Sequence, residues 1–158
     1  MLTRILQAVV LLLLSAAVTA AEVHEFMLDN GMKVLVKEDH RAPIAVSQVW
    51  YKVGASYEPR GMTGVSHVLE HMMFKGTEKH GPNEFSQIIA ANGGKENAFT
   101  GRDYTAYFQT LASDRLQVAF ELEADRMENL NLDDTEFQKE RQVVIEERRM
   151  RTDDKPTA

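Results

Sequence analysis

Two histidines and a glutamate stand close together at His67, Glu70 and His71, in the order His-x-x-Glu-His. On a helix, residues four apart lie one above the other, and a residue three after the first joins the same side. Neutral imidazole is a preferred zinc ligand, and a carboxylate beside a zinc-activated water can take its proton. The spacing therefore predicts that His67 and His71 bind zinc and that Glu70 is a general base, with a third protein ligand still required.

The segment around these residues is apolar on most sides if it is helical. Its apolar members are Val65, Val68, Leu69, Met72, Met73 and Phe74. A helix that is apolar all round is typical of a buried element, and polar groups inside it need partners because unpaired buried charges are costly. A core histidine satisfied by a hydrogen bond is the alternative interpretation of either imidazole alone.

A second helical run, from about Asp133 to Arg151, offers the missing ligand. Its apolar sector is formed by Phe137, Val143, Val144 and Ile145. At about 100° per residue, Glu140 and Glu147 fall near the centre of that sector, whereas Glu146 points well away from it. We therefore expect Glu147 to be the third metal ligand and Glu140 to orient a ligand or help bind the metal. A solvated helix position is the alternative for Glu140.

Together these segments resemble the N-terminal part of peptidase family M16, the family of pitrilysin, insulin-degrading enzyme and the mitochondrial processing peptidase. The similar segments are 28–31, 54–58, 64–77, 97–100, 103–107 and 140–147. Ser66 is a small departure, because the family more often has Ala before the first histidine. The resemblance implies one zinc ion per chain, with the ligands, base and supporting glutamate at the positions that the helix argument indicates.

The same resemblance implies a substrate site and a partner. The segment Asn97, Ala98, Phe99 and Thr100 is similar to the family's edge strand, against which an extended peptide lies. An ordinary inner strand is the alternative interpretation. Active members combine two related halves or subunits, so a second M16-like half or subunit is the expected partner, beside a peptide or unfolded protein substrate.

The remaining pattern predicts an α+β fold in which an antiparallel sheet packs with helices, as the resemblance implies for the N-terminal half of an M16 peptidase. Strands are expected at 23–28, 32–36, 44–53, 97–100 and 104–111, with a hairpin turn at 29–31. Two further helices are expected, one at 82–91 and one from a Ser113 cap to about Met127. The inner side of the latter is expected to be Leu116, Ala119, Phe120, Leu122 and Ala124.

Residues 1–21 have the pattern of a secretory signal peptide. Arg4 precedes an apolar run from Ile5 to Leu14, and small residues continue to Ala21. The run is too short for an ordinary membrane span, although an uncleaved anchor is the alternative. We expect residues 22–158 to be an M16 N-terminal domain, incomplete at its C-terminus, located in a bacterial periplasm. The chain has no Cys for a lipid anchor or a disulfide.

The charge balance bears on partners. Loss of Arg4 with the signal leaves 17 basic and 24 acidic residues, so the net charge moves from −6 to −7. An acidic balance argues against nucleic acid and anionic membrane surfaces as partners, and no membrane contact is expected after signal cleavage.

Three function classes are compared for this chain. The leading hypothesis is a zinc-dependent metalloendopeptidase that hydrolyses peptides or small unfolded proteins with metal-activated water. The alternative is a non-catalytic M16-like partner subunit that binds peptide or supports an active subunit, although such members usually lose part of the motif. The S-ribosylhomocysteine lyases have a similar fold and motif but need a cysteine ligand, which this chain lacks. Without a second half, the chain is expected to bind zinc yet hydrolyse poorly.

Overall fold

A computed structural model describes residues 22–153 of the chain. The expected signal peptide at 1–21 and the last residues, 154–158, lie outside the described residues. The chain divides into an N-terminal unit that ends at Ala42 and a second unit that begins at Pro43. Within residues 22–153, no helix combines the length and the apolar character that crossing a membrane requires.

The N-terminal unit contains an antiparallel hairpin of β1 (Val23–Met27) and β2 (Lys33–Lys37). The backbone N–H of Leu28 donates to the carbonyl of Met32 at 2.9 Å and closes the connecting loop. Gly31 has a φ of +83°, a conformation that residues with a side chain rarely adopt. The hairpin and its turn are confirmed as the sequence predicted.

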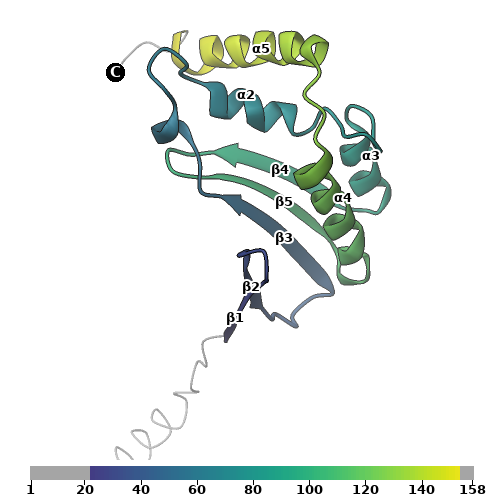
Figure 1. Cartoon of the computed structure of the whole chain (residues 1–158). Coiled ribbons are helices and arrows are strands. Elements are labelled where there is room, and N and C mark those ends of the chain that lie inside the picture. Colours follow the sequence, from purple (N-terminus) through teal and green to yellow (C-terminus); the bar gives the residue numbers. More distant parts are fainter. Residues whose placement is uncertain (1–21, 154–158) are drawn as a thin grey trace, which may run out of the picture. The chain divides into compact units, whose positions relative to one another are not determined.

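The second unit is built on a three-stranded antiparallel sheet with the order β3-β5-β4. The strands are β3 (Ile44–Tyr51), β4 (Lys95–Thr100) and β5 (Thr105–Ala112). β5 lies between its two neighbours and is the most deeply buried of the three (Figure 1). This arrangement confirms the expected antiparallel sheet.

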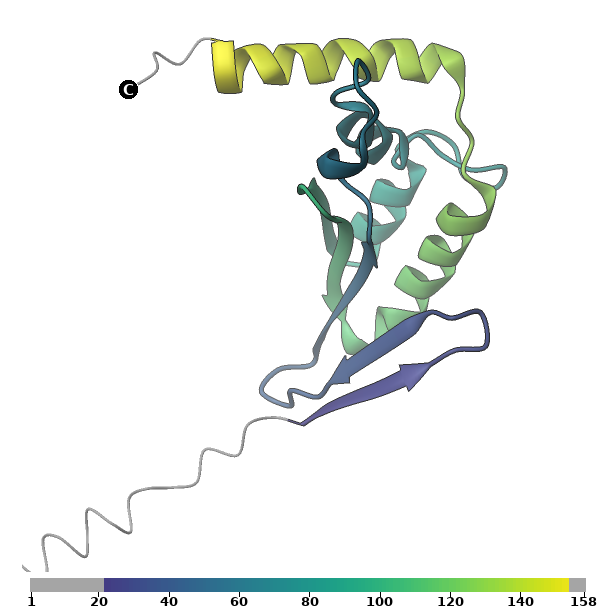
Figure 2. The same ribbon diagram turned by 60° about the vertical axis from the view of Figure 1, so that its left-hand side comes forward.

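Four helices accompany the sheet. They are α2 (Val65–Met72), α3 (Glu84–Ala91), α4 (Leu116–Asn129) and α5 (Asp134–Arg148), the last continued by a π-helical turn at Arg149–Asp153. Both views show α4 across one face of the sheet and α5 lying over α2 (Figures 1 and 2). α2 contacts β4 and α5, so it joins the sheet to the last helix. The α+β prediction is confirmed.

The apolar core of this unit lies between α3, α4 and β5. Its buried members are Phe85, Ile89, Leu111, Ala119 and Leu122. In α3 and α4 these residues are three or four apart, so each helix turns one apolar stripe toward the sheet.

The prediction that the His-x-x-Glu-His helix is buried on most sides is wrong. In α2 only Met72 is buried, while Val65 and Leu69 are 42% and 43% exposed. The helix lies between the sheet edge and α5, so its remaining side faces solvent. Half exposure leaves a path by which solvent and ligands can approach the histidines.

The predicted inner side of α4 is also partly wrong. Phe120 is 56% exposed and Ala124 is exposed, whereas Glu123, Asp125 and Arg126 are buried. Glu123 can face inward because it pairs with Arg126 and accepts a hydrogen bond from Gln109 of β5. Asp125 pairs instead with Lys79 and Thr77.

The expected Ser113 cap is wrong as well. Ser113–Arg115 forms a short 3₁₀ turn, η2, and α4 begins only at Leu116 without a side-chain cap hydrogen bond. The backbone N–H of Ser113 donates instead to the carbonyl of Pro43 at 3.1 Å. The segment before α4 is therefore held by a backbone hydrogen bond to the residue that precedes β3, and the helix has no side-chain cap.

Candidate metal centre

The two histidines of α2 and a glutamate of α5 form one cluster. His67 and His71 lie four residues apart on the same side of α2, with ring centroids 4.9 Å apart. Because α5 runs alongside α2, it brings Glu147 to them (Figure 1). One ligand atom from each of the three side chains lies within 4.8 Å of the others. The structure therefore brings together the three residues that the sequence predicted as ligands.

The spacing within this cluster fits a shared metal ion. His67 Nε2 lies 3.6 Å from Glu147 Oε2, and His71 Nε2 lies 3.7 Å from Glu147 Oε1. These distances are too long for good hydrogen bonds, but they are near the ~3.4 Å that separates two ligand atoms around a tetrahedral zinc ion. Two imidazoles and a carboxylate are also donors that zinc prefers.

One atom of Glu147 supports the same conclusion. Glu147 Oε2 is buried and makes no hydrogen bond with any of the described residues. Arg151, with a side chain 70% exposed, approaches it to 3.2 Å without forming a well-directed hydrogen bond. A buried carboxylate oxygen without a donor is costly, and a cation between Glu147 and the two histidines would remove that cost.

Glu140 contacts the Nδ1 side of the His71 ring. Its Oε2 lies 2.8 Å from His71 Nδ1, and its Oε1 lies 2.7 Å from Lys75 Nζ. A carboxylate only accepts hydrogen bonds, so Nδ1 carries the proton and Nε2 is left free to bind a metal. Burial alone would raise the pKa of Glu140, but its hydrogen bonds with Lys75 and His71 hold that pKa below its ordinary value.

The predicted general base, Glu70, is held by the neighbouring strand. The Thr100 hydroxyl donates a hydrogen bond to Glu70 Oε2. One carboxylate oxygen of Glu70 is thus occupied, and the other is available to accept a proton. The side chain of Thr100 thus contacts the predicted base, and its expected contact with substrate stays a prediction.

The predicted substrate strand lies at one edge of the sheet within the described part of the chain. The Gly101 N–H donates a hydrogen bond to the carbonyl of Tyr104 where β4 turns into β5. In an antiparallel pair, hydrogen-bonded residues alternate with residues whose backbone groups point away from the partner strand. It follows that Asn97 and Phe99 use their backbone groups to pair with β5, whereas Ala98 and Thr100 direct theirs away from it. We call this side of β4 the open edge.

Hydrogen bonding at Ala98 agrees with that alternation. The backbone N–H of Ala98 donates at 2.9 Å to the side-chain Oδ1 of Asn97 rather than to β5. Asn97 also lines a pocket of about 290 Å³ together with members of the metal cluster. The lining residues are His71, Phe74, Lys75, Asn97, Glu140 and Glu147. The pocket thus joins β4 to the candidate ligands.

Glu58 supports the start of the ligand helix, a role the sequence did not reveal. Its carboxylate accepts hydrogen bonds from the backbone N–H groups of Gly64 at 2.8 Å and Ser66 at 2.9 Å, at the first turn of α2. Desolvation raises the pKa of Glu58, but these two backbone hydrogen bonds hold it below its ordinary value. Glu58 lies in a loop, so no helical spacing could have indicated this contact.

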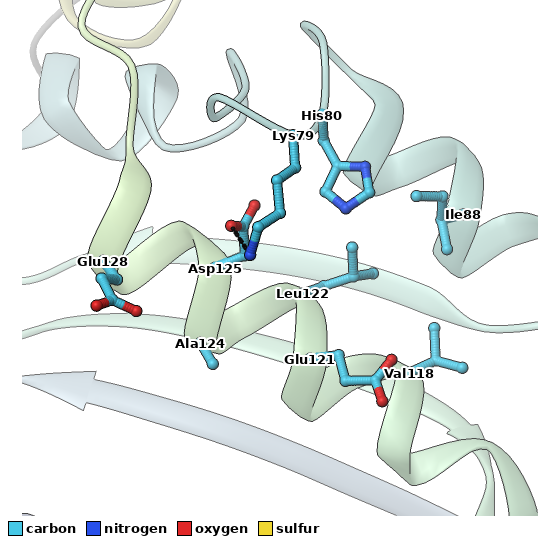
Figure 3. Close-up of a pocket in the computed structure, with 9 residues that line it drawn as sticks. All are labelled: Lys79, His80, Ile88, Val118, Glu121, Leu122, Ala124, Asp125 and Glu128. Carbon is cyan, nitrogen blue, oxygen red and sulfur yellow. Dashed lines mark ion pairs between the residues drawn. The ribbon is translucent and has the colours of Figure 1, made fainter.

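A larger pocket, of about 530 Å³, lies between α4 and the segment that leads into α3 (Figure 3). Lys79 Nζ pairs with Asp125 at 3.1 Å on one side of it, and His80 lies nearby. None of the candidate ligands lines this pocket. Among residues 22–153, the only group suited to hold a metal ion is the His67, His71 and Glu147 cluster.

Comparisons with known proteins agree with this geometry. Residues 33–157 match the family described as Insulinase (Peptidase family M16). A zinc protease of Helicobacter pylori, PqqE, is 40% identical over 96% of this chain and 35% of its own length. A crystal structure of a protease from Helicobacter pylori superposes with a TM-score of 0.82 at 39% identity, over 87% of this chain and 33% of the other.

Another relative is named as a subunit of a complex and not as a protease. Subunit 1 of the mitochondrial cytochrome b-c1 complex of Bos taurus is 35% identical over 76% of this chain and 25% of its own length. The chain therefore spans between a quarter and about a third of the length of these relatives.

Proposed function

The chain belongs to peptidase family M16, and from that premise we propose that it is the metal-binding part of a zinc metalloendopeptidase. The observation that carries the proposal is the convergence of His67, His71 and Glu147, whose ligand atoms are spaced for a shared cation. When bound, zinc would supply the Lewis acidity that makes water a usable nucleophile near neutral pH.

Glu70 is the general base in this proposal. Its carboxylate accepts the proton of the attacking water and later delivers it to the departing amine. The hydrogen bond from Thr100 fixes one oxygen of Glu70, so the orientation of the other is set before substrate arrives. A base that is already oriented needs less reorganisation during the reaction.

The open edge of β4 is the proposed substrate site. The backbone groups of Ala98 and Thr100 face away from β5, so they are available to an extended peptide that adds to the sheet. Pairing of this kind uses backbone groups and is nearly independent of side chains, which suits peptides and small unfolded proteins. Because Thr100 also holds Glu70, a peptide bound there would run past the base.

We propose that hydrolysis also requires a second M16-like half or subunit. The metal cluster is only partly buried, with side chains of its three members 17% to 30% exposed. Water-excluding closure and further donors to the transition state strengthen catalysis in enzymes of this kind. A partner that closes over the pocket would supply both.

A non-catalytic partner subunit is the second candidate function. It is favoured by the relative named as a subunit of the cytochrome b-c1 complex, rather than as a protease. The presence of His67, His71, Glu140 and Glu147 in one connected site, with Glu70 between the two histidines on α2, favours the enzyme. We further propose that residues 1–21 direct export to a periplasm, with neither nucleic acid nor membrane as a partner.

The test compares wild type with E70Q for zinc content and for cleavage of quenched fluorescent peptides of mixed sequence. The glutamine keeps the size of the side chain but cannot take a proton, so E70Q is expected to bind zinc as wild type does and to lose cleavage. E78Q serves as the matched control, since Glu78 is exposed and outside the site. Cleavage by E70Q at the wild-type rate would contradict the role of Glu70.

The same assay separates the two candidate functions. Peptide cleavage by wild type, alone or with an added M16-like half, supports the enzyme. Peptide binding and zinc binding with no cleavage under either condition would favour the partner subunit.

A further inference from the structure

Lys75 is largely buried, and its ammonium group contacts Glu140 beside the metal cluster. It lies just beyond the end of α2, with a side chain 14% exposed, and its Nζ is 2.7 Å from Glu140 Oε1. We propose that Lys75 is a positioning residue that fixes the Glu140 carboxylate and thereby selects the metal-binding tautomer of His71. The proposal rests on the zinc site proposed above and adds a residue to it.

The two oxygens of Glu140 are divided between two partners. Oε1 faces Lys75 and Oε2 faces His71 Nδ1 at 2.8 Å. With both oxygens engaged, the carboxylate cannot rotate about its last bond without losing a partner. His71 Nδ1 therefore always meets an acceptor, which keeps its proton there and leaves the lone pair on Nε2, the atom that faces Glu147.

Burial makes the contribution of Lys75 larger than that of an ordinary surface pair. The Glu140 side chain is only 11% exposed, so water cannot easily replace a lost partner at Oε1. Without the ammonium group, the carboxylate would lose its restraint on one side and turn toward other donors. His71 would then be free to place its proton on either nitrogen.

The backbone fixes Lys75 at this point. Gly76, the next residue, has a φ of +104°, and a Cβ there would lie 2.5 Å from the carbonyl oxygen of His80. The following Thr77 donates its hydroxyl to Asp125 at 2.5 Å and bridges to Leu130. The turn after α2 is thus tied to the end of α4, so Lys75 has little freedom to leave Glu140.

The experiment reads the tautomer of His71 in metal-free protein. Long-range ¹⁵N–¹H NMR distinguishes a proton on Nδ1 from one on Nε2, and competition with a chelator gives the zinc dissociation constant. Wild type is expected to show His71 with its proton on Nδ1. K75M is expected to show a mixture of both tautomers and a zinc dissociation constant raised about 10- to 100-fold.

The chain offers a matched control on α5, the helix that carries Glu140. Lys139 pairs with Glu136 at 2.6 Å, but the Lys139 side chain is 63% exposed and the pair touches no candidate ligand. K139M should therefore leave the His71 tautomer and the zinc affinity unchanged. A structural effect of losing any Lys–Glu pair would alter both variants alike.

Two outcomes would overturn the proposal. One is a folded K75M that keeps the wild-type tautomer and zinc affinity. If K75M does not fold, K75R decides: it retains the charge, so wild-type behaviour is expected, and a folded K75R that loses both the tautomer and the affinity would also overturn the proposal. If no variant including wild type binds zinc, yet the tautomer changes in K75M, the zinc site is wrong and the positioning role of Lys75 stands.

Discussion

Two polar clusters lie on the helix side of the sheet, and they differ in how their carboxylates are neutralised. In the first, Glu147 faces His67 and His71 at 3.6 and 3.7 Å and keeps one buried oxygen without a hydrogen bond among the described residues. In the second, Glu123 is directly paired with Arg126, and both are almost completely buried.

The second cluster carries its own cation and a packed environment. Gln109 donates to Glu123 at 2.5 Å, and the Arg126 guanidinium lies over the rings of Phe85 at 4.3 Å and Tyr107 at 4.5 Å. Such stacking compensates a guanidinium that is cut off from water. The carboxylate of Glu123 is therefore paired with a buried cation of the chain, whereas Glu147 has only the exposed Arg151 near it and is arranged so that a metal ion can enter.

The largest expected effect would come from breaking the buried pair of Glu123 and Arg126. R126M leaves Glu123 buried without its cation, and removing one partner of a buried pair typically costs about 3–5 kcal/mol of folding free energy. Urea unfolding followed by circular dichroism would measure it. The double variant E123L/R126M should regain much of the loss because no charge is left unpaired. An R126M protein as stable as wild type would mean that the pair is not the support described above.

The stabilisation that zinc gives is expected to depend on the first cluster and not on the second. Saturating zinc is expected to stabilise wild type by about 2.7 kcal/mol at a hundredfold excess over its dissociation constant, and R126M by a similar increment. E147Q should gain almost nothing from zinc because it lacks the third ligand. E146Q is the control, since Glu146 is one residue earlier on α5, exposed, and paired with Arg149. Equal zinc stabilisation of E147Q and wild type would remove Glu147 from the ligands.

A smaller effect is expected at the contact between the base and the sheet. T100V removes the hydroxyl that holds Glu70 but keeps the shape of the side chain. Peptide cleavage should fall roughly tenfold, in line with a lost hydrogen bond to a charged group, while zinc affinity is unchanged. T100S restores the hydroxyl and should recover most of the rate. Weakened zinc binding in T100V would show that Thr100 shapes the metal cluster as well.

The smallest effect concerns a carboxylate neutralised in a third way, by backbone N–H groups. E58Q weakens the cap of α2 and should cost about 1 kcal/mol at neutral pH. Because the pKa of Glu58 is lowered in the folded state, its stabilisation is present above the ordinary glutamate pKa of about 4.3. It is lost as the pH falls through the lower folded value.

Urea titrations of wild type and E58Q at several pH values would check this prediction. The difference between the two proteins should shrink on acidification. A difference that stays constant down to about pH 3 would assign the loss to packing instead of charge.

Helical periodicity predicted which candidate ligands share a face on each helix, and the family resemblance predicted that the two helices meet. His67 and His71 are one turn apart and Glu147 lies two turns from Glu140, so the spacing alone set which side chains share a face. Lys75 continues the same spacing one turn past His71 and could have been found by extending the pattern. Its contact with Glu140 still depends on how α5 packs against α2, which no local pattern contains.

The errors in the sequence prediction have a common physical origin. The exposed Phe120 and the buried Glu123 and Arg126 reverse the usual rule that apolar residues face inward. The reversal depends on Gln109 of β5, which donates to Glu123, and on the aromatic rings that stack on Arg126. Those partners come from distant parts of the sequence, as does the Thr100 hydroxyl that reaches Glu70.

The open edge of β4 has a consequence for how the protein behaves at high concentration. An unpaired strand edge can form backbone hydrogen bonds with another chain and is a common starting point for aggregation. Here the Asn97 amide already occupies the N–H of Ala98, so a second molecule must displace that amide before the two sheets can join. The side chain of Asn97 therefore opposes edge-to-edge pairing between two copies of the sheet.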